Sequence, residues 1–443
     1  MRTHLAILAF ITGIVLANAG QAAGPPNIVF FLIDDLGRTD VGFMGCNDIQ
    51  TPNIDSLARS GAILDSHYVQ PVCSPTRAAL LTGRYATRTG VYTIVRPHAK
   101  WGLPLDERTL ASALKDAGYE TAITGKWHLG EFEKAYRPTS RGFDHQHGHY
   151  FGAIDYFTHV RDQSHDWYHD DKELNEEGYS THLIAKKACR LIEVKDKTKP
   201  LFLYVPFNGV HSPMQVPEKY LAPYAKLPAN RMKLAGMLSA VDEAIGDIVN
   251  SIEKAGLRDN TLIIFSSDNG GPNPKKLSTN GMLKAGKGTL YEGGVRVCAF
   301  ANWPGKIKGG TTITEPMHVV DWFPTLVNLA GGDANKQSAS LPLDGRDVWP
   351  MLTQGEKSPH DEILLVQSPT RAALRMGDWK LLWNAAQPQR KKSSTDQWEL
   401  YNLTSDIGEL KNLVSDEPKQ LALMQERLMA RLKDAVPDGS VSP

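Results

Sequence analysis

Several apolar runs of strand length end abruptly at polar or charged residues. They are Asn27 to Ile33 before Asp34-Asp35, Thr121 to Thr124 before Gly125-Lys126-Trp127-His128, Leu201 to Phe207 before Asn208-Gly209-Val210-His211, and Leu262 to Phe265 before Ser266-Ser267-Asp268-Asn269. Unbroken apolar runs are typical of strands that are buried on both faces, as in a parallel sheet covered by helices. We therefore predict a central, mostly parallel β-sheet.

Helical segments lie between these runs. They are Pro52 to Arg59, Asp106 to Ala117 and Asn230 to Lys254, each followed closely by a glycine. Strands that alternate with helices predict an α/β fold, in which ligands bind beyond the carboxyl ends of the strands. One acid after a strand is more often a turn or cap residue. Four such endings with acids, amides, histidines and a lysine favour a functional site.

The pattern changes near residue 355. Short β-like stretches at 362–367, 371–376, 379–383 and 399–403 precede a helical stretch at 418–433. This order predicts a small antiparallel sheet with one helix, and the polar stretch 387–396 is expected to be an exposed loop. Because a single core stops growing at roughly 250 to 300 residues, we predict a catalytic domain at 24–354 and a C-terminal subdomain at 355–443.

The first 23 residues have the pattern of a secretory signal peptide. An apolar run from Leu5 to Ala17 leads into small residues before Gly24. A membrane anchor is the alternative, but the run is shorter than the ~20 apolar residues that a spanning helix needs. We expect an exported protein, periplasmic or extracellular, or lysosomal in a eukaryote, without stable membrane insertion.

Charge and cysteine content exclude several classes of protein. Lysines and arginines number 49, as do aspartates and glutamates, so no global field attracts nucleic acid. The four cysteines, Cys46, Cys73, Cys189 and Cys298, form no Cys-x-x-Cys pair, which argues against a disulfide framework or a structural zinc site. Cys298 is predicted to be a buried strand residue.

Cys73 begins the sequence Cys-Ser-Pro-Thr-Arg, which continues as Ala-Ala-Leu-Leu-Thr-Gly-Arg. Pro75 favours a helix start, so Cys73 would lie at the positive helix end and Arg77 on the same face, where both favour an anion. A capping turn is the alternative for so short a motif. With its continuation, the segment resembles the signature of type I sulfatases, in which a maturation enzyme oxidises this cysteine to formylglycine.

The resemblance continues along nearly the whole chain, most closely to the arylsulfatase B (N-acetylgalactosamine-4-sulfatase) group. The other matching segments are 34–35, 124–130, 211–213, 268–271, 287–294, 375–380 and 399–403. It implies an alkaline-phosphatase-like sulfatase fold and hydrolysis of sulfate esters. Ser212 stands where the arylsulfatase B pattern typically has an acid, so the same substrate does not follow.

Asp34, Asp35, Asp268 and Asn269 form an all-oxygen ligand set. Such ligands suit calcium or magnesium rather than zinc. The resemblance implies one Ca²⁺ per chain, with Mg²⁺ as the alternative, and a further ligand from the formylglycine at Cys73.

The resemblance also assigns roles in catalysis. Arg77 and Lys126 would surround the sulfate. A hydrated aldehyde offers one hydroxyl that attacks sulfur and a second that later collapses to expel sulfate. Asp268 would help to activate the attacking hydroxyl, and the remaining proton transfers would fall to His128, His211 and Lys287.

Further histidines lie outside these motifs, at His98, His145, His147, His149, His159, His165 and His169. A second metal site around 145–149 is one interpretation, but no acidic partner recurs beside it at ligand spacing. We predict instead that this region lines the mouth of the substrate site, together with Asp155, Tyr156 and Trp167.

Two other functions remain open at this point. One is a phosphoesterase or phosphonate monoester hydrolase of the alkaline phosphatase superfamily, which shares the sheet and the strand-end metal ligands. The other is an inactive, sulfatase-like binding protein, although no residue of the motif set is missing. The expected partners are a sulfated glycan, first of all of the N-acetylgalactosamine 4-sulfate type, or a small aryl sulfate, and the maturation enzyme.

Overall fold

The computed structural model describes residues 24–272, 277–337, 341–386 and 395–441. The predicted signal peptide, residues 1–23, lies outside the described residues, as do residues 387–394 of the predicted loop. Within the described ranges, no helix combines the length and the apolar character needed to cross a membrane. The signal peptide therefore stays a prediction.

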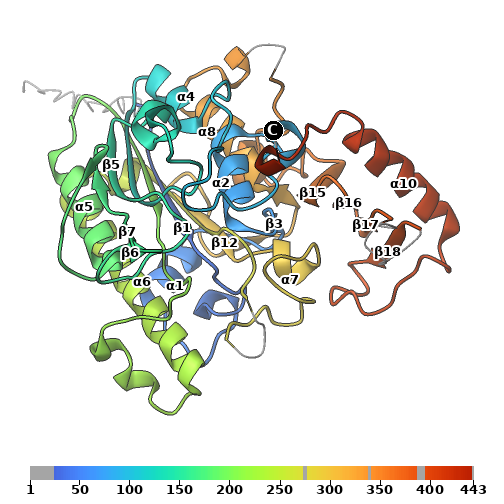
Figure 1. Ribbon diagram of the computed structural model, residues 1–443, viewed down its shortest axis with the longest axis horizontal. Helices are drawn as coiled ribbons and strands as arrows, with labels where there is room; N and C mark the ends of the chain where they lie inside the picture. The colour runs from blue at the N-terminus through green and yellow to red at the C-terminus, as the bar shows by residue number, and fades with distance from the viewer. Residues whose placement is uncertain (1–23, 273–276, 338–340, 387–394, 442–443) are drawn as a thin grey trace, which may run out of the picture.

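A ten-stranded sheet forms the centre of the molecule (Figure 1). Its order is β13-β2-β12-β11-β1-β10-β4-β5-β8-β9. The bounds are β1 Asn27–Ile33, β2 Ala62–Leu64, β4 Glu120–Lys126, β5 His145–His149, β8 Tyr168–His169, β9 Lys172–Glu173, β10 Leu201–Pro206, β11 Thr261–Ser267, β12 Ala299–Asn302 and β13 Thr311–Ile313. The central strands β11, β1, β10, β4 and β5 are parallel, which confirms the predicted fold class.

Helices cover both faces of this sheet (Figure 1). Successive side chains of β1 point to opposite faces, and all seven are buried. Ile28 and its alternate neighbours pack with α2 (Cys73–Thr82), α4 (Leu110–Asp116) and α8 (Trp322–Leu329). Val29 and its alternate neighbours pack with α1 (Pro52–Arg59), α5 (Ser180–Val194) and α6 (Ala229–Lys254).

Shorter elements complete this part of the chain. Two strand pairs, β3 with β14 and β6 with β7, lie outside the large sheet. The bounds are β3 His67–Tyr68, β6 Val160–Arg161, β7 Ser164–His165, β14 Met317–His318, α3 Ala86–Thr89, α7 Glu292–Val295 and α9 Trp349–Gln354.

The C-terminal part is a four-stranded antiparallel sheet with one long helix, as predicted. The bounds are β15 Glu362–Ser368, β16 Arg371–Met376, β17 Trp379–Asn384, β18 Gln397–Asn402 and α10 Pro418–Leu432. Met424 and Leu428 of α10 and Leu364 of β15 belong to the apolar core that also covers one face of the large sheet. The boundary near residue 355 stays a prediction, because this core is continuous across it.

Three local differences from the predicted elements have physical causes. Helix α4 begins at Leu110 rather than near Asp106, because the Thr109 side chain caps it by accepting the Ser112 N–H at 3.1 Å. Cys298 is fully buried, but it precedes β12 rather than lying within it. Strand β5 was not predicted, because its sequence His-Gln-His-Gly-His is polar, yet it pairs in parallel with β4.

Candidate active site

The carboxyl ends of β1 and β11 bring four predicted ligands together. These strands pair in parallel up to Ile33 and Ser267, so the acidic residues that follow each strand lie side by side. The backbone N–H of Asp35 donates to Asp268 Oδ1 at 3.2 Å. Burial, followed by the negative charge of Asp34, raises the pKa of Asp268.

Cys73 points into the same cluster. It is the first residue of α2 and is 2% exposed. Its Sγ lies 3.5 Å from Asp34 Oδ1, and one ligand atom from each of Cys73, Asp34, Asp35 and Asp268 lies within 4.8 Å of the others. Burial raises the pKa of the thiol.

Two fully buried cations neutralise part of this acidity. Arg77 Nη2 lies 2.8 Å from Asp268 Oδ2, and Lys126 Nζ contacts Asp34 Oδ2. Burial alone would raise the pKa of Asp34, but nearby positive charges, first that of Lys126, hold it below its usual value. Arg77 also donates to the Lys126 carbonyl at 2.9 Å, so the two cations are fixed relative to each other.

Lys287 and His211 approach the cluster from two other loops. Lys287 Nζ lies 2.5 Å from Asp35 Oδ1 and 3.6 Å from Cys73 Sγ. His211 Nε2 lies 3.6 Å from Asp35 Oδ2, and both side chains remain about one-fifth exposed, at 20% and 19%. They therefore lie where the buried cluster opens to solvent.

His128 lies beside the cluster rather than inside it. Burial, then the charges of Lys126 and Arg77, lower its pKa well below the usual value, so the ring is neutral. Its Nδ1 has no hydrogen-bond partner among the described residues. A Cβ at Gly152 would lie 2.4 Å from the ring Nε2, so only glycine at 152 leaves room for this ring.

The site contains a buried oxygen that fits a metal ion. Asn269 Nδ2 donates to Asp35 Oδ1 at 2.8 Å, while Asn269 Oδ1 has no partner within the described residues. Buried polar atoms are normally paired, and amide and carboxylate oxygens are the ligands that hard cations prefer. Asp34, Asp35, Asp268 and Asn269 therefore fit an oxygen-bound divalent cation.

Sequence reasoning missed several residues that support the site. Ser74 Oγ donates to the His128 carbonyl at 2.8 Å, and Asn280 Oδ1 accepts the Gly271 N–H at 3.0 Å. Ser74 lies inside the cysteine motif, which was a usable signal. Asn280 is an isolated loop residue, and nothing in its surrounding sequence marks it.

The predicted substrate mouth needs correction at two residues. Tyr156 and Trp167 are 1% and 0% exposed, so the prediction that they line the mouth is wrong. The Tyr156 hydroxyl lies 2.7 Å from the carbonyl oxygens of both Asn208 and His211, and thus supports the loop that carries His211. Trp167 stacks on His159 with ring centroids 4.4 Å apart.

The histidines near β5 pair with acids one at a time. His147 lies 3.2 Å from Glu176, and His165 lies 3.1 Å from Glu173. Among the residues that the structure describes, only one group of three or more His, Cys, Asp or Glu side chains has the geometry of a metal site, and it consists of Asp34, Asp35, Cys73 and Asp268.

Acids that follow β1 and β11, a thiol and an arginine of α2 and the lysine that ends β4 thus meet at the carboxyl edge of the sheet, where α/β enzymes bind their ligands. The sulfatase family profile matches residues 26–332, and the chain belongs to the sulfatase family. It is 39% identical to arylsulfatase J of Mus musculus over 83% of this chain. That match spans 63% of the relative's length.

Two further similarities agree with this family. N-acetylgalactosamine-6-sulfatase of Mus musculus is 32% identical over 89% of this chain and 77% of its own length. The crystal structure of Ps i-CgsB in complex with k-i-k-neocarrahexaose has 32% identity and a TM-score of 0.85, over 94% of both chains. The predicted class of enzyme, a sulfatase, is confirmed at the level of the family. Sulfatases generally use a formylglycine and a divalent metal, and the buried acids around Cys73 fit that use.

Proposed function

We propose that this protein hydrolyses sulfate esters of a carbohydrate, with Cys73 oxidised to formylglycine by a separate maturation enzyme. The position of Cys73 carries this proposal. It begins a buried helix and points its Sγ at Asp34 and its neighbouring carboxylates. No other cysteine in the described part of the chain lies in such a cluster.

The sulfate group would lie against Arg77, Lys126 and the amino end of α2. All three favour an anion, and both side chains are fully buried, so their charges act in a medium of low dielectric constant. His211 and Lys287 lie at the exposed rim, where the alcohol part of the ester would leave. His128, neutral and with a free Nδ1, would accept the proton whose removal releases sulfate.

We further propose calcium, with magnesium as the alternative, on Asp34, Asp35, Asp268 and Asn269. The unpartnered Asn269 Oδ1 and the absence of any histidine from the ligand set support a hard cation. When bound, the cation supplies positive charge that polarises a sulfate oxygen.

A carbohydrate is the substrate class that the similarities support best. One relative is an N-acetylgalactosamine-6-sulfatase, and the solved relative Ps i-CgsB is in complex with k-i-k-neocarrahexaose. A sugar of the N-acetylgalactosamine type, sulfated at position 4, is our first candidate, with position 6 and small aryl sulfates as further substrates. Residues 1–23 support export of the protein to the compartment where such polymers occur.

The test is sulfate release from a panel of defined substrates. The panel contains 4-sulfated and 6-sulfated N-acetylgalactosamine, a sulfated galactose oligosaccharide, an aryl sulfate and a lipid sulfate, compared by kcat/KM. We expect a sugar to be preferred over the lipid, and Cys73→Ala to release none. Preference for the lipid, with no sugar cleaved above background, contradicts the substrate and leaves the sulfatase chemistry intact.

A further inference from the structure

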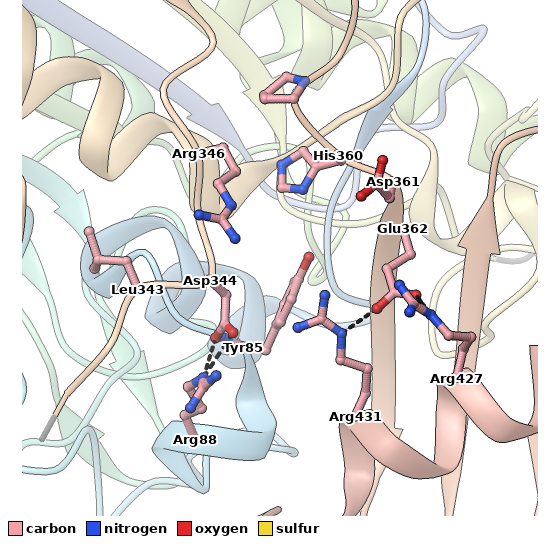
Figure 2. Close-up of a pocket in the computed structure, with 11 residues that line it drawn as sticks. Tyr85, Arg88, Leu343, Asp344, Arg346, His360, Asp361, Glu362, Arg427 and Arg431 are labelled. Atoms are coloured by element: carbon pink, nitrogen blue, oxygen red, sulfur yellow. Dashed lines mark hydrogen bonds and ion pairs between the residues drawn. The ribbon is translucent and has the colours of Figure 1, made fainter. Parts of the chain in front are cut away.

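A cavity of about 160 Å³ lies where α10 meets the helices of the large sheet (Figure 2). Its walls come from the segment after α2, the loop 341–348, the start of β15 and α10. Helix α2 has ten residues, which corresponds to a length of about 15 Å. Cys73 begins that helix and the cavity lies beyond its other end, so this is not the active site.

Four arginines line the cavity: Arg88, Arg346, Arg427 and Arg431. Arg88 is paired, because its Nε lies 2.8 and 2.9 Å from the two oxygens of Asp344. Arg427 and Arg431 share Glu362, which both contact through Nε. One carboxylate thus serves two guanidinium groups, and their terminal nitrogens make no hydrogen bond within the described residues.

Arg346 is an exposed residue that lines the cavity. Its guanidinium makes no hydrogen bond or ion pair to any residue in the described ranges, although its backbone N–H donates to Asp321. The nearest acid in sequence that lines the cavity, Asp344, is taken by Arg88. Asp361 is exposed and points away from the arginines (Figure 2). The cavity therefore has a surplus of positive charge.

Tyr85 adds a hydrogen-bond donor to the same space. The residue is 5% exposed, and its hydroxyl lies between Arg346, His360 and Arg431 (Figure 2). Burial, and then the charge of Asp321, raise the pKa of this hydroxyl well above its usual value. It therefore keeps its proton at neutral pH and can donate it to an anion.

We propose that this cavity is a second anion site, which binds one tetrahedral oxyanion, sulfate or phosphate, between Arg346 and Arg431. Guanidinium groups recognise such anions through paired N–H groups in a plane. A cavity of about 160 Å³ has room for a tetrahedral anion, since a single water needs only about 10 to 15 Å³ of such volume. Because Arg346 belongs to a loop beside α9 and Arg431 to α10, the bound anion ties α10 to the rest of the molecule.

The direct test uses selenate, a sulfate analogue, in crystals of the full chain. We expect two anomalous peaks per chain, one at Arg77 and one in the cavity. Arg346→Gln should lose only the cavity peak, and it breaks no ion pair, so it should fold normally. An empty wild-type cavity, or a cavity peak that survives in Arg346→Gln, overturns the proposal.

Calorimetry then measures the affinity in solution at constant ionic strength. Sodium sulfate and sodium phosphate are titrated separately, with sodium acetate as a planar anion of single charge. Loss of one charge-assisted contact should weaken oxyanion binding at this site about tenfold or more in both Arg346→Gln and Arg431→Gln. Acetate binding as tight as that of both oxyanions overturns the assignment of a tetrahedral anion.

Lys357→Gln is the matched control, since its side chain is 93% exposed and it removes the same charge outside the cavity. We expect this variant to keep the wild-type affinity. If it weakens binding as much as Arg346→Gln does, the effect is one of general surface charge, and the proposal fails. Turnover of an aryl sulfate should be unchanged in Arg346→Gln, because Arg346 lies away from the reacting atoms.

Discussion

Lys287 and Glu292, five residues apart in the chain, belong to two different buried clusters of charge, which differ in how completely they are paired. In the cluster of Glu292, which we call the Lys380 cluster, Lys380 Nζ lies 2.9 Å from both Glu292 Oε1 and Glu409 Oε1. Glu292 Oε2 accepts from the Tyr68 hydroxyl at 2.7 Å, and Glu409 Oε2 accepts the Glu292 N–H at 2.7 Å. Three of the four carboxylate oxygens accept a hydrogen bond, and the fourth, Glu409 Oε1, is held by its ion pair with Lys380.

The active-site cluster is incompletely paired. Cys73 Sγ has only long contacts, at 3.5 Å to Asp34 and 3.6 Å to Lys287, and Asn269 Oδ1 has none in the described residues. A fully paired buried network contributes rigidity and a fixed geometry, whereas unpaired buried groups persist where a ligand completes them. We infer that the Lys380 cluster holds the segment 287–292 on the C-terminal sheet and that the active-site cluster performs the chemistry.

The largest expected effect is the loss of turnover when Cys73 of the active-site cluster is replaced. Cys73→Ala should lower kcat by at least about a thousandfold, because it removes the attacking group, and should leave thermal stability nearly unchanged. Mass spectrometry of the wild-type peptide should show an aldehyde at this position. Cys298→Ala, which removes another buried thiol, is the control and should retain turnover. Full activity with an unmodified thiol at Cys73 contradicts the mechanism.

Metal removal tests whether the unpaired oxygen of Asn269 belongs to a metal site. Chelation should lower activity about a hundredfold or more, because the cation contributes several kcal/mol to catalysis, and calcium or magnesium should restore it. Elemental analysis of the active enzyme should give one such ion per chain, and Asn269→Ala should lower that occupancy. Stoichiometric zinc with neither calcium nor magnesium would show that the ligand assignment is wrong.

Substitution of Lys380 should lower the stability of the protein rather than its kcat. Lys380→Met leaves buried Glu409 without its cation and leaves Glu292 with only the longer ion pair to Arg296, at 3.5 Å. Breaking a buried ion pair typically costs about 3 to 5 kcal/mol of unfolding free energy. Urea denaturation measures this loss, and the folded fraction should keep its kcat for an aryl sulfate. Lys411→Met removes an exposed, paired lysine and should change stability little. If Lys380→Met and Lys411→Met are equally stable, the Lys380 cluster does not have the structural role inferred for it.

The two clusters also show how far the sequence alone could lead. The strand ends at Asp34 and Asp268 were predictable, because apolar runs that stop at acids mark the carboxyl edge of a parallel sheet. The pairing of Glu292 with Lys380 was not, since 88 residues separate them and their two motifs gave no sign of contact. Strand β5 was missed for a related reason, because its own sequence is polar and its buried histidines, His147 and His149, pack against Trp167, which is distant in sequence.

The smallest expected effect concerns a single buried histidine outside both clusters. His67 is fully buried, and its Nε2 accepts a hydrogen bond from Trp322 Nε1 at 3.1 Å, an arrangement that needs a neutral ring. Burial lowers the pKa of His67 to about 3, below the value near 6.5 expected in the unfolded chain. The unfolded state therefore binds the proton first. The stability contributed by the neutral ring is fully present above pH 6.5 and is lost as the pH falls toward 3, by up to about 1.4 kcal/mol per pH unit. Other buried histidines titrate in the same direction, so the measurement is the difference between the wild type and His67→Gln, whose amide oxygen can still accept from Trp322. Urea denaturation at pH 7 and at pH 5.5 should give a smaller loss of stability in the variant, by about 1 kcal/mol. An equal loss in both proteins would show that His67 takes up its proton without unfolding.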